Sequence, residues 1–214
     1  MAKIMKTQSG TEIEDGIEYS TYPPPDCLVK VMKQCWAERL LFEGAIRFAS
    51  LAYYRKLENS VLGDPNDGEG MLRMNGHPYE VGSINSVYAW CSSLTTITPE
   101  RIIVLAKCGG YDCLVRIHQP SILIKRVQLA KSKYLHLHCA EISYNRGIEV
   151  DKITLNSQKF HFNIFQKDQR FSEDKEYRFT LIDNSIKPEF KLYIDLQIGD
   201  CSDIMEIDKL PACK

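Results

Sequence analysis

The feature that most constrains the fold is an alternation of apolar and polar residues, which runs through the chain from about residue 84. A period of two places every second side chain on one face of an extended strand, so the segment can bury that face. A glycine turn at 109–110 separates two such stretches and predicts a hairpin there. We predict strands at 86–95, 101–107, 113–117, 121–130, 134–144, 159–165, 175–182 and 190–196.

The front of the chain has a different, helical spacing. Apolar residues recur at helical intervals over 26–44, with Asp26 as the expected N-cap and Gly44 as the stop. A short strand is predicted at 45–49 and a second helix over 50–60, capped by Ser50. Helices followed by many strands predict an α+β fold, with N-terminal helices packed on a mainly antiparallel, possibly split sheet.

The length of 214 residues suits one domain over 1–214. Residues 1–25 are expected to form a loosely held lead-in, because the three prolines that close it forbid a helix. A formal net charge of −1 argues against a dedicated nucleic-acid binder, which usually carries a basic excess. The sequence shows no secretory signal and no apolar run of about 20 residues, so we expect a cytoplasmic protein whose eight cysteines are mostly buried free thiols.

Two segments resemble metal sites but lack the full pattern. His136 and His138 share one face of a predicted strand, whereas Cys139 points to the other face. The acidic loop at 62–70 lacks the ligand spacing of an EF-hand, which favours a flexible loop. We therefore predict no metal site. The chain also lacks the phosphate-binding loop of P-loop enzymes and the glycine pattern of dinucleotide-binding folds.

Four segments occur in an order that resembles a known family. They are a helix-strand-helix segment at 28–59, the acidic loop at 63–70, the strand "YAWCSSLT" at 88–95 and "RFSEDKEYRF" at 170–179. Over 26–182 this order resembles bacterial and phage-borne proteins grouped as a domain of unknown function, with an "ND…E" loop and a late "E-x-E-W-R" strand. That layout is similar to the ADP-ribosyltransferase superfamily, whose members bind NAD in the cleft of a split sheet.

The resemblance implies a set of site residues. Glu176 corresponds to the late catalytic glutamate, Arg47 to an early basic residue that contacts the cofactor, and Ser92 or Ser93 to the serine of the middle strand. Apart from the resemblance, Tyr53, Tyr54 or Trp90 would offer a flat apolar wall for a ring, and Tyr54 is the candidate among them for contact with the cofactor. Lys30 stands near the position where many relatives have a histidine. Cleaving the nicotinamide–ribose bond builds positive charge on the sugar, which a carboxylate stabilises.

Two functions remain open on these grounds. The first is an ADP-ribosyltransferase-like domain that uses NAD to modify a protein or nucleic-acid acceptor, in a toxin, phage-defence or counter-defence setting. The second is a non-enzymatic protein of bacterial or phage origin that captures a partner, through the aromatic segment at 50–59. A metal-dependent hydrolase that uses His136 and His138 ranks third.

Overall fold

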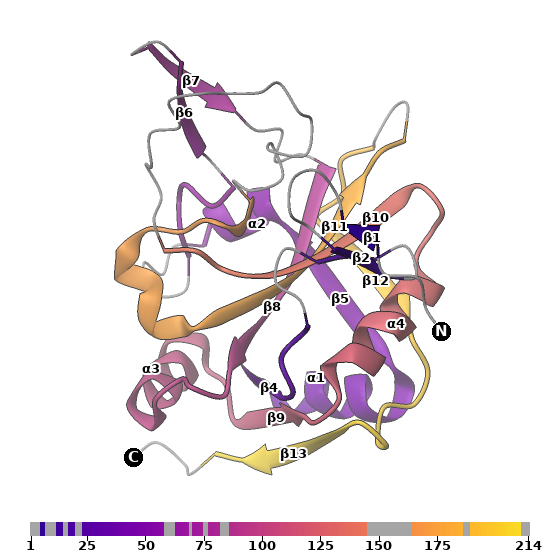
Figure 1. Ribbon diagram of the computed structural model, residues 1–214. Helices are drawn as coiled ribbons and strands as arrows, with labels where there is room; N and C mark the ends of the chain where they lie inside the picture. The colour runs from indigo at the N-terminus through magenta and orange to yellow at the C-terminus, as the bar shows by residue number, and fades with distance from the viewer. Residues whose placement is uncertain are drawn as a thin grey trace.

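A mainly antiparallel sheet with short helices packed on it forms the fold, as the computed structural model in Figure 1 shows. The predicted α+β class is therefore confirmed. The structure describes residues 5–6, 12–14, 17–19, 23–57, 63–68, 70–74, 77–81, 86–144, 164–185 and 189–210.

Eleven strands within these ranges form one sheet, and two more form a separate hairpin. The path of the main sheet is β1-β2-β3-β10-β11-β8-β4-β9-β13, and β5 pairs with both β8 and β12. The strands of the main sheet are β1 Met5–Lys6, β2 Glu12–Glu14, β3 Ile17–Tyr19, β4 Leu28–Met32, β5 Ala45–Ser50, β8 Val87–Leu94, β9 Cys113–Ile117, β10 Leu135–Glu141, β11 Glu176–Asp183, β12 Tyr193–Gln197 and β13 Met205–Lys209. The hairpin consists of β6 Gly70–Met74 and β7 His77–Val81.

The helices are short. They are α1 Gln34–Glu38, the π-helical turn η1 Arg39–Glu43, α2 Leu51–Arg55, α3 Pro99–Gly109, α4 Pro120–Ala130 and the 3-10 helix η4 Gln169–Asp174. None of the helices in the described ranges has the length and apolar character needed to cross a membrane. The cysteines that the structure describes are all free, and Cys113, Cys139 and Cys201 are buried.

The core lies on both faces of the central strands β8 and β11. Seven consecutive residues of β11, from Glu176 to Ile182, are buried. The rings of Trp90 and Phe179, which are paired across β8 and β11, have centroids 5.1 Å apart. A strand that is covered on both faces loses the simple alternation of a surface strand, since neither face needs to be polar.

The sheet is split along one edge of β8, and this split positions the candidate site. β5 pairs with β8 only at Tyr88 and Ala89, and β4 pairs with it only at Ser93 and Leu94. Residues 90–92 of β8 therefore have no strand partner on that edge among the described residues. β4 continues beyond this point as the partner of β9.

The helix predicted over 26–44 is wrong in its first half. Residues 28–32 form β4, and helical structure begins at Gln34. The β-branched residues Val29 and Val31 suit a strand, and pairing with β9 stabilises that choice over the helical spacing. The predicted stop is confirmed, because Gly44 takes a left-handed conformation with φ of 67°.

Two predicted strands are in fact helices. Residues 101–107 lie in α3 and residues 121–130 in α4, so the hairpin predicted around the glycine turn is also wrong. Each helix has a proline in its first turn, which favours a helix start. The Thr98 hydroxyl accepts a hydrogen bond from the Arg101 amide at 3.2 Å, and Gly110 ends α3 in a left-handed conformation.

The other expected elements are found near their predicted places. Strands β5, β8, β9, β10, β11 and β12 confirm the predictions at 45–49, 86–95, 113–117, 134–144, 175–182 and 190–196. The Ser50 hydroxyl caps α2 by accepting from the Tyr53 amide at 3.1 Å. Most of the strand predicted at 159–165 lies outside the described residues. Strand β13 was not predicted, and β3 in the lead-in pairs with β10 and buries Ile17.

Gly44 provides a sharp test of this chain path. A Cβ built on Gly44 would overlap the carbonyl oxygen of Gly199, and the Gly44 carbonyl accepts from the Ile198 amide at 2.9 Å. Gly110 has a similar φ of 61° with nothing within 4 Å of a built Cβ. Gly110→Ala should therefore cost only the conformational penalty of about 1–2 kcal/mol. We expect Gly44→Ala to cost clearly more in urea unfolding, and equal losses would contradict the packing described.

Candidate functional site

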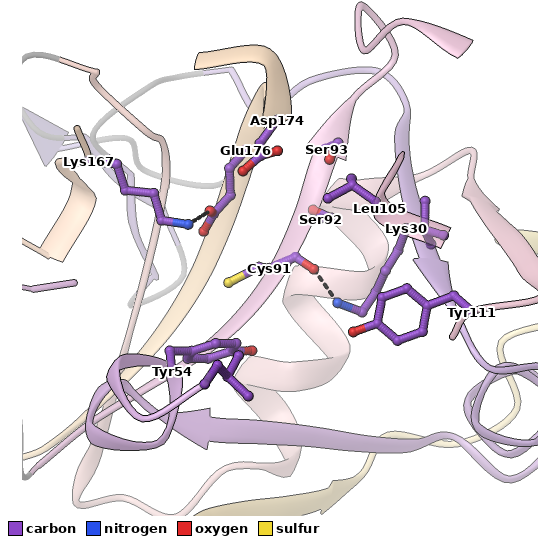
Figure 2. Close-up of a pocket in the computed structure, with 12 residues that line it drawn as sticks. Lys30, Tyr54, Cys91, Ser92, Ser93, Leu105, Tyr111, Lys167, Asp174 and Glu176 are labelled. Atoms are coloured by element: carbon purple, nitrogen blue, oxygen red, sulfur yellow. Dashed lines mark hydrogen bonds and ion pairs between the residues drawn. The ribbon is translucent and has the colours of Figure 1, made fainter. Parts of the chain in front are cut away.

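A pocket of ≈ 160 Å³ opens at the split between β4 and β8 (Figure 2). It combines residues from β4, α2, β8, α3, η4 and β11 with three from connecting segments, which follow α2, follow α3 and precede η4. The lining residues are Lys30, Val31, Tyr54, Leu57, Cys91, Ser92, Ser93, Leu105, Tyr111, Lys167, Asp174 and Glu176. The structure thus brings together four of the five candidate site residues: Glu176, Ser92, Ser93 and Tyr54.

Glu176 is held at the start of β11 by its local backbone. Lys175, just before it, has a left-handed conformation with φ of 46°, which turns the chain from η4 into the strand. The Glu176 amide donates to the Tyr144 hydroxyl at 2.8 Å. The side chain is 5% exposed, so its carboxylate is almost entirely removed from bulk water.

Two cations hold the Glu176 carboxylate. Oε1 accepts from Nε of Arg178 at 2.7 Å. Oε2 accepts from Nζ of Lys167 at 2.6 Å, the contact drawn as a dashed line in Figure 2. Burial disfavours the charged form of Glu176, but the two cations outweigh it, so the pKa of the carboxyl lies well below its usual range. Glu176 is therefore an ionised group with a fixed direction.

The depressed pKa of Glu176 predicts how stability depends on acid. A carboxyl whose pKa is lower in the folded protein stabilises the fold fully above its unfolded pKa, about 4.3, and this contribution is lost as the pH falls toward the folded pKa. In Glu176→Gln this loss is absent. We expect the unfolding free energy of the variant to fall less steeply below about pH 4, by up to about 1.4 kcal/mol per pH unit. The unfolding free energy is measured by urea unfolding at several pH values. An equal change per pH unit in the wild type and in Glu176→Gln would contradict the buried ion pairs.

Arg178 ties the acidic loop to this carboxylate. It is 0% exposed and makes a bidentate pair with Asp67, from Nη1 to Oδ1 at 2.8 Å and from Nη2 to Oδ2 at 3.0 Å. Its Nη1 also donates to the Ile164 carbonyl at 2.6 Å. The Arg55 side chain donates to the Asp67 carbonyl at 2.6 Å. The part of the loop that the structure describes is therefore anchored, although its sequence favoured a flexible loop.

The two serines have different surroundings. Ser92 is 4% exposed, and its hydroxyl donates to the Tyr177 carbonyl at 2.9 Å. Ser93 is paired directly with Glu176 across β8 and β11. Since directly paired residues project to the same side of a sheet, Ser93 shares its face with the carboxylate. The geometry therefore favours Ser93 over Ser92 as the pocket hydroxyl.

Tyr54 and Cys91 line the pocket as neutral groups. Burial raises the pKa of Tyr54 well above its usual value, and its hydroxyl lies 3.5 Å from the Ala89 carbonyl oxygen. Burial, with the nearby Glu176 charge, raises the pKa of Cys91 to about 12. A thiol with this pKa is protonated near neutral pH, so Cys91 lacks the thiolate that a catalytic nucleophile requires.

Arg47 lies away from the pocket. Its side chain is 47% exposed on β5 and pairs with Asp195 of β12, with contacts of 2.7 and 2.8 Å. Its guanidinium also lies over the Tyr193 ring, 4.8 Å from the centroid. The alternation of β5 explains this outcome, because Ile46 and Phe48 face the core and leave Arg47 on the solvent side.

Three charged residues of this region were missed from the sequence: Lys167, Asp174 and Asp67. Asp174 forms an ion pair with Arg101 of α3 at 2.6 Å, and burial raises its pKa. No local pattern shows which residues these side chains pair with, because the partners of Asp67 and Asp174 lie 111 and 73 residues away in the sequence. A loop position such as Lys167 gives no periodic signal at all.

The histidine pair does not assemble a metal centre in the described part of the chain. His136 is exposed, whereas His138 is 3% exposed and its ring lies 4.7 Å from that of Phe165, measured between centroids. Among the residues that the structure describes, no group of three His, Cys, Asp or Glu side chains lies close enough to hold a metal ion.

Comparison of the chain with family models, curated proteins and solved structures gives no match.

Proposed function

We propose that the protein is an ADP-ribosyltransferase-like enzyme that uses NAD as a substrate and modifies a protein or nucleic-acid acceptor. One observation carries the proposal: an ionised, buried glutamate, Glu176, lines a pocket at the split of the sheet. Ser93 and Tyr54 line the same pocket, where Ser93 suits the serine that the resemblance implies and Tyr54 offers an aromatic wall.

The proposed reaction breaks the bond between the ribose C1′ and the nicotinamide nitrogen. Nicotinamide leaves with the electron pair of that bond, and an oxygen or nitrogen of the acceptor bonds to C1′ and releases its proton. Positive charge develops on the ribose on the way, so a fixed anion lowers the barrier. Glu176 supplies such an anion.

The ion pairs of Glu176 leave it able to bind a substrate. A carboxylate has about four lone-pair positions, and the contacts with Arg178 and Lys167 use one on each oxygen. The remaining positions can accept a hydrogen bond from a ribose hydroxyl. Because both cations hold the group in place, little reorganisation is needed when the substrate binds.

Incubation of the purified protein with NAD tests the proposal. Released nicotinamide is measured by chromatography, and NAD labelled on its adenine reports transfer of ADP-ribose to proteins or nucleic acids of a bacterial extract. We expect nicotinamide release, with label on a macromolecule when the acceptor is present. A protein that neither releases nicotinamide nor binds NAD in calorimetry would refute the proposal.

A non-enzymatic, partner-capturing protein is the second candidate, and a different surface favours it. Trp36 and Phe42, on α1 and η1, are 44% and 62% exposed. The aromatic segment first considered, at 50–59, is less available: Tyr54 lines the pocket and Tyr53 lies 5.2 Å from Tyr193 between ring centroids. Capture of a partner that Trp36→Ser abolishes, with no NAD turnover, would favour this alternative.

A further inference from the structure

We propose that Lys30 is the anion-binding residue of the pocket and holds a phosphate group of the ligand. The inference rests on the proposed function, since it assigns the diphosphate of NAD to this amine. It gives Lys30 the contact with the anionic part of the cofactor, in place of Arg47, which the resemblance implies as the early basic residue.

The position of Lys30 follows from the split in the sheet. Lys30 comes directly after Val29, the last residue of β4 that pairs with β8. Its Nζ bridges the split by donating a hydrogen bond to the Cys91 carbonyl on the unpaired stretch of β8 (Figure 2). It also lies over the Trp90 ring, 4.7 Å from the centroid.

Lys30 differs from the other cations around the pocket in having no carboxylate partner within 4 Å among the described residues. The other cations each hold at least one. These pairs are Lys167 with Glu176 at 2.6 Å, Arg101 with Asp174 at 2.6 Å, and Arg178 with both Asp67 at 2.8 Å and Glu176 at 2.7 Å.

Lys30 is partly buried where it lines the pocket, and a partly buried ammonium without a counter-ion is costly, so it favours losing its proton or gaining an anion. Burial lowers the pKa of Lys30, which is the expected response in the free protein. An ammonium has three donors, and the Cys91 carbonyl occupies one of them. Two N–H groups remain for phosphate oxygens, and an approaching phosphate also favours the charged form of the amine.

Lys30 lies apart from Glu176 in the pocket, so one ligand can place its phosphate groups at the lysine and its ribose at the carboxylate. Figure 2 shows Lys30 and Tyr111 on one side of the pocket and Glu176 with Lys167 on the other, with β8 between them. An anionic group at Lys30 would leave the ribose free to face the carboxylate. Arg47 offers no such arrangement, because it lies outside the pocket and its Nε and Nη2 already donate to the Asp195 carboxylate.

Calorimetric titration of variants with defined probes tests the inference. The probes are ADP-ribose, inorganic pyrophosphate and adenosine, which lacks phosphate. Loss of a charge-assisted hydrogen bond should weaken ADP-ribose and pyrophosphate about 10- to 100-fold in Lys30→Met. The matched control is Lys33→Met, an exposed lysine three residues along the chain, which should bind all three probes like the wild type.

Several results would overturn the inference. One is wild-type affinity for ADP-ribose and pyrophosphate in Lys30→Met, and another is an equal loss of adenosine binding, which would mark a merely structural effect. If Lys30→Met does not fold, the test is instead made on the wild-type protein, by measuring reductive methylation of its lysines with and without pyrophosphate. Pyrophosphate should protect Lys30 but not Lys33, and an unchanged extent of Lys30 methylation would be a negative result.

The inference and the proposed function fail separately. Lys30→Met can release nicotinamide with the KM and kcat of the wild type. That result would support the proposed enzymatic function and reject the role of Lys30. Binding of ADP-ribose that depends on Lys30, without any nicotinamide release, would retain the phosphate site and reject the enzymatic reaction.

Discussion

Replacing Arg178 by methionine is expected to destabilise the protein by about 3–5 kcal/mol, since removing one member of a buried ionic network leaves the other charges without a partner. Arg178 is fully buried and holds two carboxylates, those of Asp67 and Glu176. Methionine fills much of the same space, so the loss reports charge and hydrogen bonding more than packing. The measurement is the midpoint and slope of urea unfolding.

A surface arginine provides the matched control for this variant. Arg116 of β9 pairs with Asp208 at 3.1 Å, but both side chains are well exposed, at 38% and 47%. Exposed pairs contribute less than about 1 kcal/mol, so Arg116→Met should be nearly neutral. In the double variant Arg178→Met, Asp67→Leu, part of the lost stability should return because one unpaired buried carboxylate is removed. Equal losses for Arg178→Met and Arg116→Met would contradict the network.

Replacing Glu176 by glutamine is expected to lower kcat for nicotinamide release by at least about 100-fold, the range found when a group that stabilises transition-state charge is removed. The variant keeps the shape of the side chain and loses its negative charge. KM should change much less than kcat, because the charge on the ribose develops mainly in the transition state. Steady-state assays of both constants provide the measurement.

The control for the Glu176 variant is Glu173→Gln, which removes an exposed carboxylate three residues earlier in the chain. It should release nicotinamide at the wild-type rate. Near-ultraviolet circular dichroism checks that Glu176→Gln is folded. We expect a folded variant, because Asp67 remains available as a carboxylate partner for Arg178. Full activity in Glu176→Gln would remove the carboxylate from the mechanism.

Local patterns predicted those parts of the fold that depend on nearby residues. The alternation around Tyr88 and around Phe179 identified β8 and β11, and a glycine correctly marked the end of the first helical segment. The same patterns misassigned 101–107 and 121–130, because short runs rich in Ile, Val and Leu suit a strand or a buried helix equally well. The prolines at 99 and 120 and the Thr98 cap were the signals that distinguish the two.

The sequence by itself determined the α+β class, the central strands and the place of Glu176 at the start of one of them. It also determined that Arg47 faces away from its apolar neighbours. Only the tertiary structure decided what surrounds Glu176 and where the sheet splits. Arg178 reaches Asp67 across 111 residues, and Lys30 reaches Cys91 across 61. Such contacts depend on which strands pair, and strand pairing is a property of the whole core rather than of any single segment.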